Sequence, residues 1–126
     1  MEKSIIKTDS APAPIGPYNQ AVKANGFLFI SGQIPIDPAT NELISGGIEE
    51  ETEQVMKNLE AILKEADAGF ENVVKTTIFL TDMALFTQVN EIYGKRFGDN
   101  APARETVAVK GLPKNVNVEI SMIAAL

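Results

Sequence analysis

An arginine and a glutamate near the C-terminus are the charged residues of this sequence best placed to do chemistry. Arg104 opens the strand-like run that ends at Val109, and Glu119 lies between Val118 and Ile120. Charged residues are depleted in β-strands and are rarely buried without a partner. A chain that places both charges in strand-like sequence either pairs them with each other or uses them. We predict that they are used.

The neighbours of Arg104 favour a ligand site. Successive residues of a strand point to opposite faces, so Glu105 is expected to point away from Arg104 and not to neutralise it. Thr106 and Ala108 share the face of Arg104, and both are short. Short neighbours leave room beside a guanidinium, whose planar N–H fork suits a carboxylate. A surface arginine at a strand start is the simpler alternative.

Glu119 belongs to the polar face of the last strand, which it shares with Asn117 and Ser121. A solvent-facing strand glutamate is the simpler alternative here. If the last two strands formed a plain hairpin, Glu119 would lie near Thr106 and diagonally across from Arg104.

Four further residues are weaker candidates for a binding pocket. Tyr18 follows a Pro-rich loop, Ser31 and Gly32 end an apolar strand, and Asn90 lies in a helical stretch. Each has a simpler reading, as a packing tyrosine, a strand end or a half-exposed helix residue. None of them is specific alone.

Composition narrows the chemistry that is available. The 126 residues include no Cys and no His, which excludes disulfides, thiolate nucleophiles and the commonest general base. The formal net charge is −6 and the isoelectric point is about 4.6, so nucleic acid is not expected as a partner. Phosphate-binding loops and metal-spaced ligand sets are absent from the sequence, so we expect no metal site.

The N-terminal stretch carries charge throughout and has no long apolar run. We therefore expect no signal peptide, no membrane contact and a cytoplasmic location.

The chain is expected to form one domain, residues 1–126, because its length and its 44% hydrophobic content suit a single core. Apolar periodicity predicts helices at residues 48–68, ended by Gly69, and from 81 or 82 to about 97. Strands are predicted at residues 3–7, 21–24, 27–31, 73–80, 103–109 and 116–125, with a tight turn at Asn25-Gly26. The order β-β-β-α-β-α-β-β predicts an α+β fold with two helices on one sheet.

Three predicted strands are apolar at consecutive positions, which is typical of strands buried on both faces. These are residues 27–30, 77–80 and 120–126. Two helices cover only one face of such a sheet, so the other face is expected to pack against another copy of the chain. The sequence therefore predicts a homo-oligomer with site residues near its interfaces.

Six stretches taken together resemble the RidA (YjgF) family of reactive intermediate deaminases, over nearly the whole chain. They are Ile15-Gly-Pro-Tyr-Asn-Gln-Ala, Ser31-Gly-Gln-Ile-Pro, Val74-Lys-Thr-Thr-Ile-Phe-Leu, Val89-Asn-Glu-Ile-Tyr, Pro102-Ala-Arg and Leu112-Pro-Lys with Val118-Glu-Ile. The resemblance implies a chorismate-mutase-like mixed sheet of about six strands with two helices on one face. It also implies a homotrimer with sites between subunits, and a last strand lying between strands 27–31 and 73–80.

The resemblance further implies hydrolysis of 2-imino acids, such as 2-iminopropanoate and 2-iminobutanoate, and of their enamine tautomers. The products are 2-oxo acids and ammonia, no cofactor is needed, and pyridoxal-phosphate enzymes are thereby protected from damage. By this resemblance Arg104 binds the substrate carboxylate and Glu119 positions the attacking water. Tyr18, Ser31 and Gly32 line the pocket, and Asn90 lies at its periphery.

The sequence departs from the family at Glu105 and Thr106, where many relatives carry a small residue and a Cys. Thr106 keeps a small hydroxyl in the pocket, so Cys-based chemistry is not expected. Two other functions stay open at this point: a non-catalytic regulatory module that binds 2-oxo acids, and an endoribonuclease, against which the acidity and the absence of His argue. A chorismate mutase is disfavoured because a dianionic substrate needs more positive charge.

Overall fold

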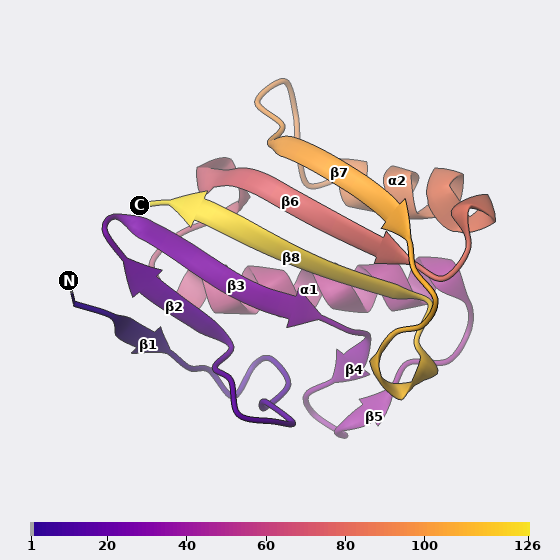
Figure 1. Ribbon diagram of the computed structural model, residues 1–126, viewed down its shortest axis with the longest axis horizontal. Coiled ribbons are helices and arrows are strands. Elements are labelled where there is room, and N and C mark those ends of the chain that lie inside the picture. Colours follow the sequence, from indigo (N-terminus) through magenta and orange to yellow (C-terminus); the bar gives the residue numbers. More distant parts are fainter. Residues whose placement is uncertain (1) are drawn as a thin grey trace.

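The computed structural model, which describes residues 2–126, is a six-stranded mixed sheet with two helices packed on one face (Figure 1). This confirms the predicted α+β class and the placement of the helices. The strand order across the sheet is β1-β2-β3-β8-β6-β7. The strands are β1 Ser4–Ile6, β2 Ala21–Ala24, β3 Phe27–Gln33, β6 Val73–Leu80, β7 Ala103–Ala108 and β8 Val118–Ala125.

The helices are shorter than predicted. Helix α1 spans Ile48–Glu65 and ends in a turn in which Asp67, with φ 56°, takes the left-handed position. Gly69 is extended, with φ −143°, so its predicted role as the residue ending α1 is wrong. Helix α2 spans Phe86–Gly94 and follows a short 3-10 turn in which the Asp82 side chain accepts a hydrogen bond from the Ala84 N–H.

The topology places β8 in the middle of the sheet, between β3 and β6 and antiparallel to both. Strand β7 lies parallel to β6 at the edge, because α2 carries the chain back across the sheet between them. A plain hairpin of β7 and β8 is therefore wrong. The position that the family resemblance implied for the last strand is confirmed.

Turn residues fit the connections that they make. Asn25 and Gly26 both have positive φ, 51° and 81°, as a two-residue hairpin turn requires, so this predicted turn is confirmed. The stretch 35–47, for which no strand was predicted, contains a two-stranded ladder of β4 Ile36–Asp37 and β5 Glu42–Leu43. The buried Asn58 amide on α1 donates to the carbonyls of Ile34 and Ile36, and so fixes the chain just after β3.

The core lies between the helices and one face of the sheet. In β8, Val118, Ile120, Met122 and Ala124 are buried, whereas the alternate residues, among them Glu119, are only partly covered. On the opposite, open face of the sheet Phe27 and Phe29 keep 42% and 45% of their surface exposed. The apolar strands are thus buried on one face within a single chain, and the second face is left uncovered.

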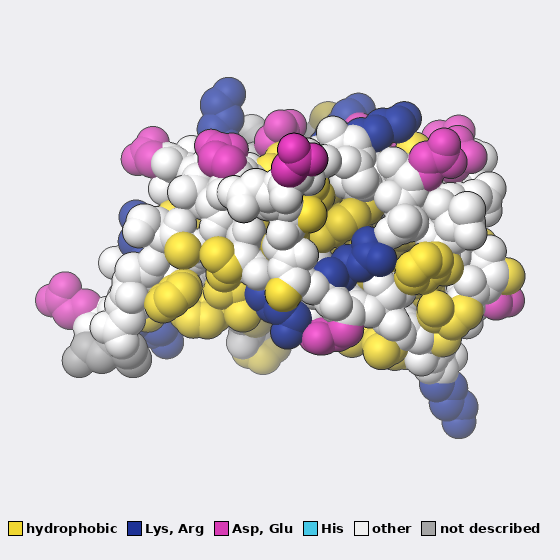
Figure 2. Space-filling view, turned by 90° about the horizontal axis from the view of Figure 1, so that it is seen from above, with side chains coloured by type: hydrophobic (Ala, Val, Ile, Leu, Met, Phe, Trp, Pro, Cys, Tyr) yellow, Lys and Arg dark blue, Asp and Glu magenta, His cyan; other side chains and the backbone are white. Residues whose placement is uncertain are grey.

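The two sides of the molecule differ in polarity. Seen from the β7 edge, acidic side chains and several basic ones stand along the helix side, and apolar groups appear toward the open face of the sheet (Figure 2). Within the described residues, no helix is long and apolar enough to span a membrane.

Candidate active site

Glu119 is a half-buried carboxyl group on the open face of the sheet. Burial raises its pKa above the ordinary value of 4.5, because removing water disfavours the charged form. No cation pairs with it among residues 2–126. An unpaired carboxyl group with a raised pKa is suited to accept a proton from water near neutral pH.

The absence of a side chain at Gly32 leaves room for the Glu119 side chain. A Cβ added at Gly32 would lie 2.1 Å from Oε2, 2.7 Å from Cδ and 2.9 Å from Cγ of Glu119. The carboxylate therefore lies directly over the Gly32 backbone, in space that any side chain would fill. The β3–β8 ladder is interrupted by a register shift between Ile30 and Gln33, which is where Ser31 and Gly32 lie.

The loop that carries Tyr18 is tied to this strand. The Ser31 hydroxyl donates to the Asn19 carbonyl at 2.6 Å. The buried Gln20 amide donates to the carbonyls of Thr8, Ala11 and Pro12, and its oxygen accepts from the Thr8 N–H. These hydrogen bonds fix the path of the Pro-rich loop.

Tyr18 itself is 46% exposed, and its hydroxyl accepts a hydrogen bond from the Ile15 N–H at 3.3 Å. Tyr18 and Gly32 line the same small cavity, of about 20 Å³, together with apolar side chains that include Ile15 and Ile34. We call Tyr18, Ser31, Gly32 and Glu119 the Glu119 half-site.

Arg104 lies on the other side of the sheet, against α2. Its guanidinium donates from Nη1 to Asn90 Oδ1 at 2.6 Å, and its central carbon lies 5.6 Å and 5.1 Å from the ring centres of Phe86 and Tyr93. No carboxylate pairs with it in the part of the chain that the structure describes. A guanidinium held in this way keeps further N–H donors for a ligand.

The residues beside Arg104 fit the predicted alternation of the strand. Glu105 points to the open face, where it pairs with Lys75 at 3.2 Å and accepts from Thr77 at 3.1 Å. The Lys75 hydrogen bond lowers the pKa of Glu105. Thr106 shares the face of Arg104, since Ile78, its ladder partner, is a core residue. Its Oγ1 is the one buried side-chain polar atom without a hydrogen-bond partner in residues 2–126. We call Arg104, Asn90 and Thr106 the Arg104 half-site.

The two half-sites do not meet within one chain. Arg104 is level with Thr76 of β6, and Glu119 is level with Phe79. Their backbones are therefore about 10 Å apart along the strands and about 10 Å apart across two strand spacings. The side chains also leave opposite faces of the sheet, so no small molecule reaches both within a single copy.

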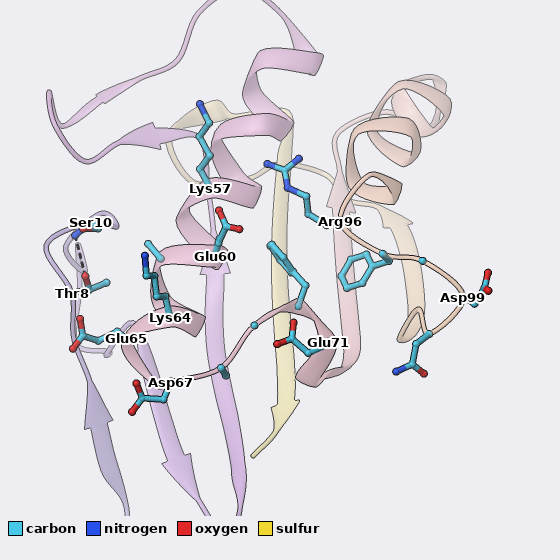
Figure 3. A pocket seen from close by; sticks show the side chains of 17 residues that line it. Thr8, Ser10, Lys57, Glu60, Lys64, Glu65, Asp67, Glu71, Arg96 and Asp99 are labelled. Atoms are coloured by element: carbon cyan, nitrogen blue, oxygen red, sulfur yellow. Dashed lines mark hydrogen bonds between the residues drawn. The ribbon is translucent and has the colours of Figure 1, made fainter.

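A much larger cleft of the single chain lies elsewhere. It has a volume of about 1180 Å³ and contains none of the predicted site residues. Figure 3 shows its side chains coming from α1, from the loop before β2 and from the segment after α2. It carries both signs of charge, including Lys57, Glu60, Lys64 and Glu71, and it is open to solvent. Among the described residues no group of three or more acidic side chains is arranged to hold a metal ion.

Phe86 and Tyr93, which contact Arg104, were not among the predicted site residues. The signal was present in the spacing: Phe86, Asn90 and Tyr93 follow one another at intervals of four and three residues, which places them on one face of α2.

The chain is similar to known proteins over nearly its whole length. Residues 8–126 match the family model described as Endoribonuclease L-PSP. The chloroplastic Reactive Intermediate Deaminase A of Arabidopsis thaliana is 48% identical over 126 residues, which cover 100% of this chain and 67% of that protein.

Two solved structures are similar throughout. YyfA of Yersinia pestis, described as a protein of unknown function of the conserved Rid family, has a TM-score of 0.96 and 48% identity, covering 99% of this chain and 100% of its own. TdcF of E. coli, solved with bound serine, has a TM-score of 0.92 and 37% identity, covering 98% of each chain. This chain therefore belongs to the RidA family of reactive intermediate deaminases, the family whose model carries the description Endoribonuclease L-PSP.

Proposed function

We propose that the protein is a hydrolytic deaminase that converts 2-imino acids, such as 2-iminopropanoate and 2-iminobutanoate, and their enamine tautomers to 2-oxo acids and ammonia. One observation carries the proposal: Arg104 is a partly buried guanidinium that is held on three sides but has no carboxylate partner among the described residues. A small carboxylic acid is the ligand that such a group binds best. The relative TdcF was solved with bound serine, and serine carries a carboxylate group of this kind.

The site is complete only if a second copy supplies its other half. We propose a homotrimer in which the Arg104 half-site of one subunit faces the Glu119 half-site of the next. The exposed apolar side chains of the open sheet face, Phe27 and Phe29 among them, support association on that face. In such an assembly Glu119 and Arg104 approach each other from different subunits, which removes the obstacle that a single sheet imposes.

The chemistry that follows uses only these groups and water. Arg104 binds the substrate carboxylate and thereby fixes the imine carbon. The imine nitrogen reacts in its protonated, iminium form: Glu119 accepts a proton from a water molecule as the water oxygen bonds to the iminium carbon, which gives a tetrahedral intermediate bearing a hydroxyl and an amino group. Glu119 then returns the proton to the nitrogen. The C–N bond breaks, the hydroxyl loses its proton as the carbonyl forms, and the departing ammonia takes up that proton.

This route requires only modest acceleration, because imines of 2-oxo acids are already electrophilic. General acid–base assistance is typically worth about 100- to 10,000-fold, so Glu119 is sufficient once the substrate is held. RNA hydrolysis is not proposed, since the formal net charge of −6 repels a phosphate backbone and the chain has no His.

A competition assay tests the proposal. An amino-acid oxidase generates the 2-imino acid in the presence of semicarbazide, and semicarbazone formation is followed by absorbance. We expect the protein to suppress semicarbazone formation, and Arg104→Ala and Glu119→Gln to abolish that suppression. Glu60→Gln, which neutralises an exposed carboxylate on α1, is the matched control and should act like the unaltered protein.

Two results would overturn the proposal in different ways. If the protein does not reduce semicarbazone formation, it is not an imine hydrolase. If it binds 2-oxobutanoate by calorimetry but turns over no imine, the regulatory module that binds 2-oxo acids is the better reading. If Glu119→Gln is fully active and Arg104→Ala is inactive, only the role assigned to Glu119 is refuted.

A further inference from the structure

Three side chains of α2 surround the Arg104 guanidinium. Phe86 and Tyr93 present their rings to it, at 5.6 Å and 5.1 Å, and Asn90 accepts its Nη1–H at 2.6 Å. The strand that carries Arg104 lies at the edge of the sheet. A long arginine side chain at a sheet edge has many rotamers, so what surrounds its end group decides where that group lies.

Tyr93 is the best fixed of the three. Its hydroxyl is 2.8 Å from the Thr76 hydroxyl, and both residues are buried. Thr76 is also the ladder partner of Arg104 in the β6–β7 pair. The same strand position therefore holds the backbone of Arg104 and, through one hydroxyl pair, the ring against which its guanidinium rests.

The Tyr93 ring also has an aromatic neighbour. Phe97 packs against it with ring centres 4.8 Å apart and an interplanar angle of 41°. Burial raises the pKa of the Tyr93 hydroxyl, so the residue stays neutral and does not compete with a ligand carboxylate for the guanidinium. A shift of the Tyr93 ring would disturb its packing against Phe97 or its hydroxyl contact with Thr76.

We propose that Tyr93, fixed by Thr76, is a positioning residue that sets the reach of the Arg104 guanidinium into the carboxylate site. The inference rests on the proposed function, because it assigns Arg104 to substrate binding. The ring holds the cation by its face, and this contact uses no N–H donor. Asn90 takes one donor, and the others remain free for a carboxylate.

The arrangement also predicts that lysine would be a poor replacement for Arg104. An ammonium group is a compact charge that lacks the planar fork, so it cannot both rest on the ring and form two parallel hydrogen bonds to a carboxylate.

The test measures carboxylate binding separately from turnover. The dissociation constant for 2-oxobutanoate is measured by calorimetry, and KM and kcat are measured in the semicarbazide competition. We expect Tyr93→Leu to weaken 2-oxobutanoate binding about 3- to 30-fold, the range of a partly desolvated cation–π contact, and to raise KM more than it lowers kcat. A residue that serves only the core would change stability without this split.

Val89→Ala is the matched control. Val89 is buried on the same helix but is not among the contacts of Arg104, so its truncation lowers stability and should leave the dissociation constant unchanged. The proposal is overturned if Tyr93→Leu binds 2-oxobutanoate as tightly as the unaltered protein, or if Val89→Ala weakens binding equally.

A double variant provides a second test in case Tyr93→Leu does not fold. The double variant Tyr93→Phe with Thr76→Val removes the hydroxyl pair and leaves no unpaired hydroxyl in the core. We expect binding to weaken about 2- to 10-fold, the range of one lost hydrogen bond, while circular dichroism stays unchanged. Unchanged binding would overturn the role of Thr76 in fixing the ring.

The two proposals fail differently. A protein that binds 2-oxobutanoate and loses affinity in Tyr93→Leu, yet hydrolyses no imine, supports the positioning role and refutes the deaminase. If the unaltered protein and Tyr93→Leu hydrolyse imines equally well, the positioning role is refuted and the deaminase proposal stands.

Discussion

Replacing Gly32 with alanine tests whether the placement of Glu119 controls activity. The added Cβ would come within 3 Å of three Glu119 side-chain atoms, the nearest being Oε2 at 2.1 Å. The backbone of Gly32 does not have the positive φ that would itself exclude alanine. The carboxylate must therefore leave its place above β3, while the strand keeps its path.

The expected effect on stability is small. Gly→Ala at a position with compatible backbone angles adds about 0.4–1 kcal/mol by restricting the unfolded chain. Forcing one side chain away from its preferred rotamer costs about 0.5–1.5 kcal/mol. The two contributions nearly cancel, so the free energy of unfolding should change by less than about 1 kcal/mol.

The expected effect on catalysis is large, because Glu119 can no longer orient the attacking water. The rate should fall toward that of Glu119→Gln, a loss of up to about 100- to 10,000-fold if Glu119 supplies ordinary acid–base assistance. Semicarbazide competition gives the rate, and urea denaturation gives the stability. Gly111→Ala is the matched control, because a Cβ there meets nothing within 4 Å.

Two outcomes would refute this reasoning. A fully active Gly32→Ala would mean that the observed position of Glu119 is not the catalytic one. If Gly32→Ala lowered the rate further in a Glu119→Gln background, Gly32 would act on the substrate and not through the carboxylate, since effects carried by one shared group should not add.

Three further predictions concern assembly, pH and the core. Phe29→Lys on the open sheet face should give monomers in light scattering and abolish activity, although Arg104 and Glu119 are intact. Because burial raises the pKa of Glu119, its charged form destabilises the fold; this cost is absent below the ordinary pKa of 4.5 and grows as pH rises through the raised value. Glu119→Gln should therefore be more stable than the unaltered protein at pH 7 and equal to it near pH 3, as measured by denaturation at both pH values. Leu59→Ala, at a fully buried position of α1, should lower the free energy of unfolding by about 2–5 kcal/mol.

Each of these has a clear contrary result. An active monomer of Phe29→Lys would refute the split site. A Glu119→Gln protein that is less stable at pH 7 would show that the carboxylate has a favourable partner in the assembly. A loss below about 1 kcal/mol in Leu59→Ala would mean that α1 relaxes to fill the space.

Sequence patterns predicted the elements well wherever the signal was local. The strand at 73–80 and the turn at Asn25-Gly26 match the structure, because β-branched runs and positive-φ residues act within a few residues. The end of α1 was wrong, since Gly69 lies two residues beyond Asp67, the residue that adopts the left-handed angles. An aspartate in that role is a weaker signal than a glycine.

The sequence by itself determined which side chains share a face. Strand alternation separates Arg104 from Glu105 and groups Glu119 with Ser121, because the period of two is a property of each strand alone. It also determined the absence of Cys and His, and with it the limited set of groups available for catalysis.

Only the tertiary structure decided how the candidate site is divided. Strand β8 lies between β3 and β6, so Glu119 lies over Gly32 and not beside the strand of Arg104. The order of the strands in the sheet depends on which apolar faces α1 and α2 cover, and therefore on packing between segments distant in the sequence. The same packing points Arg104 toward α2 and Glu119 toward the open face, a separation that no local pattern in the chain contains.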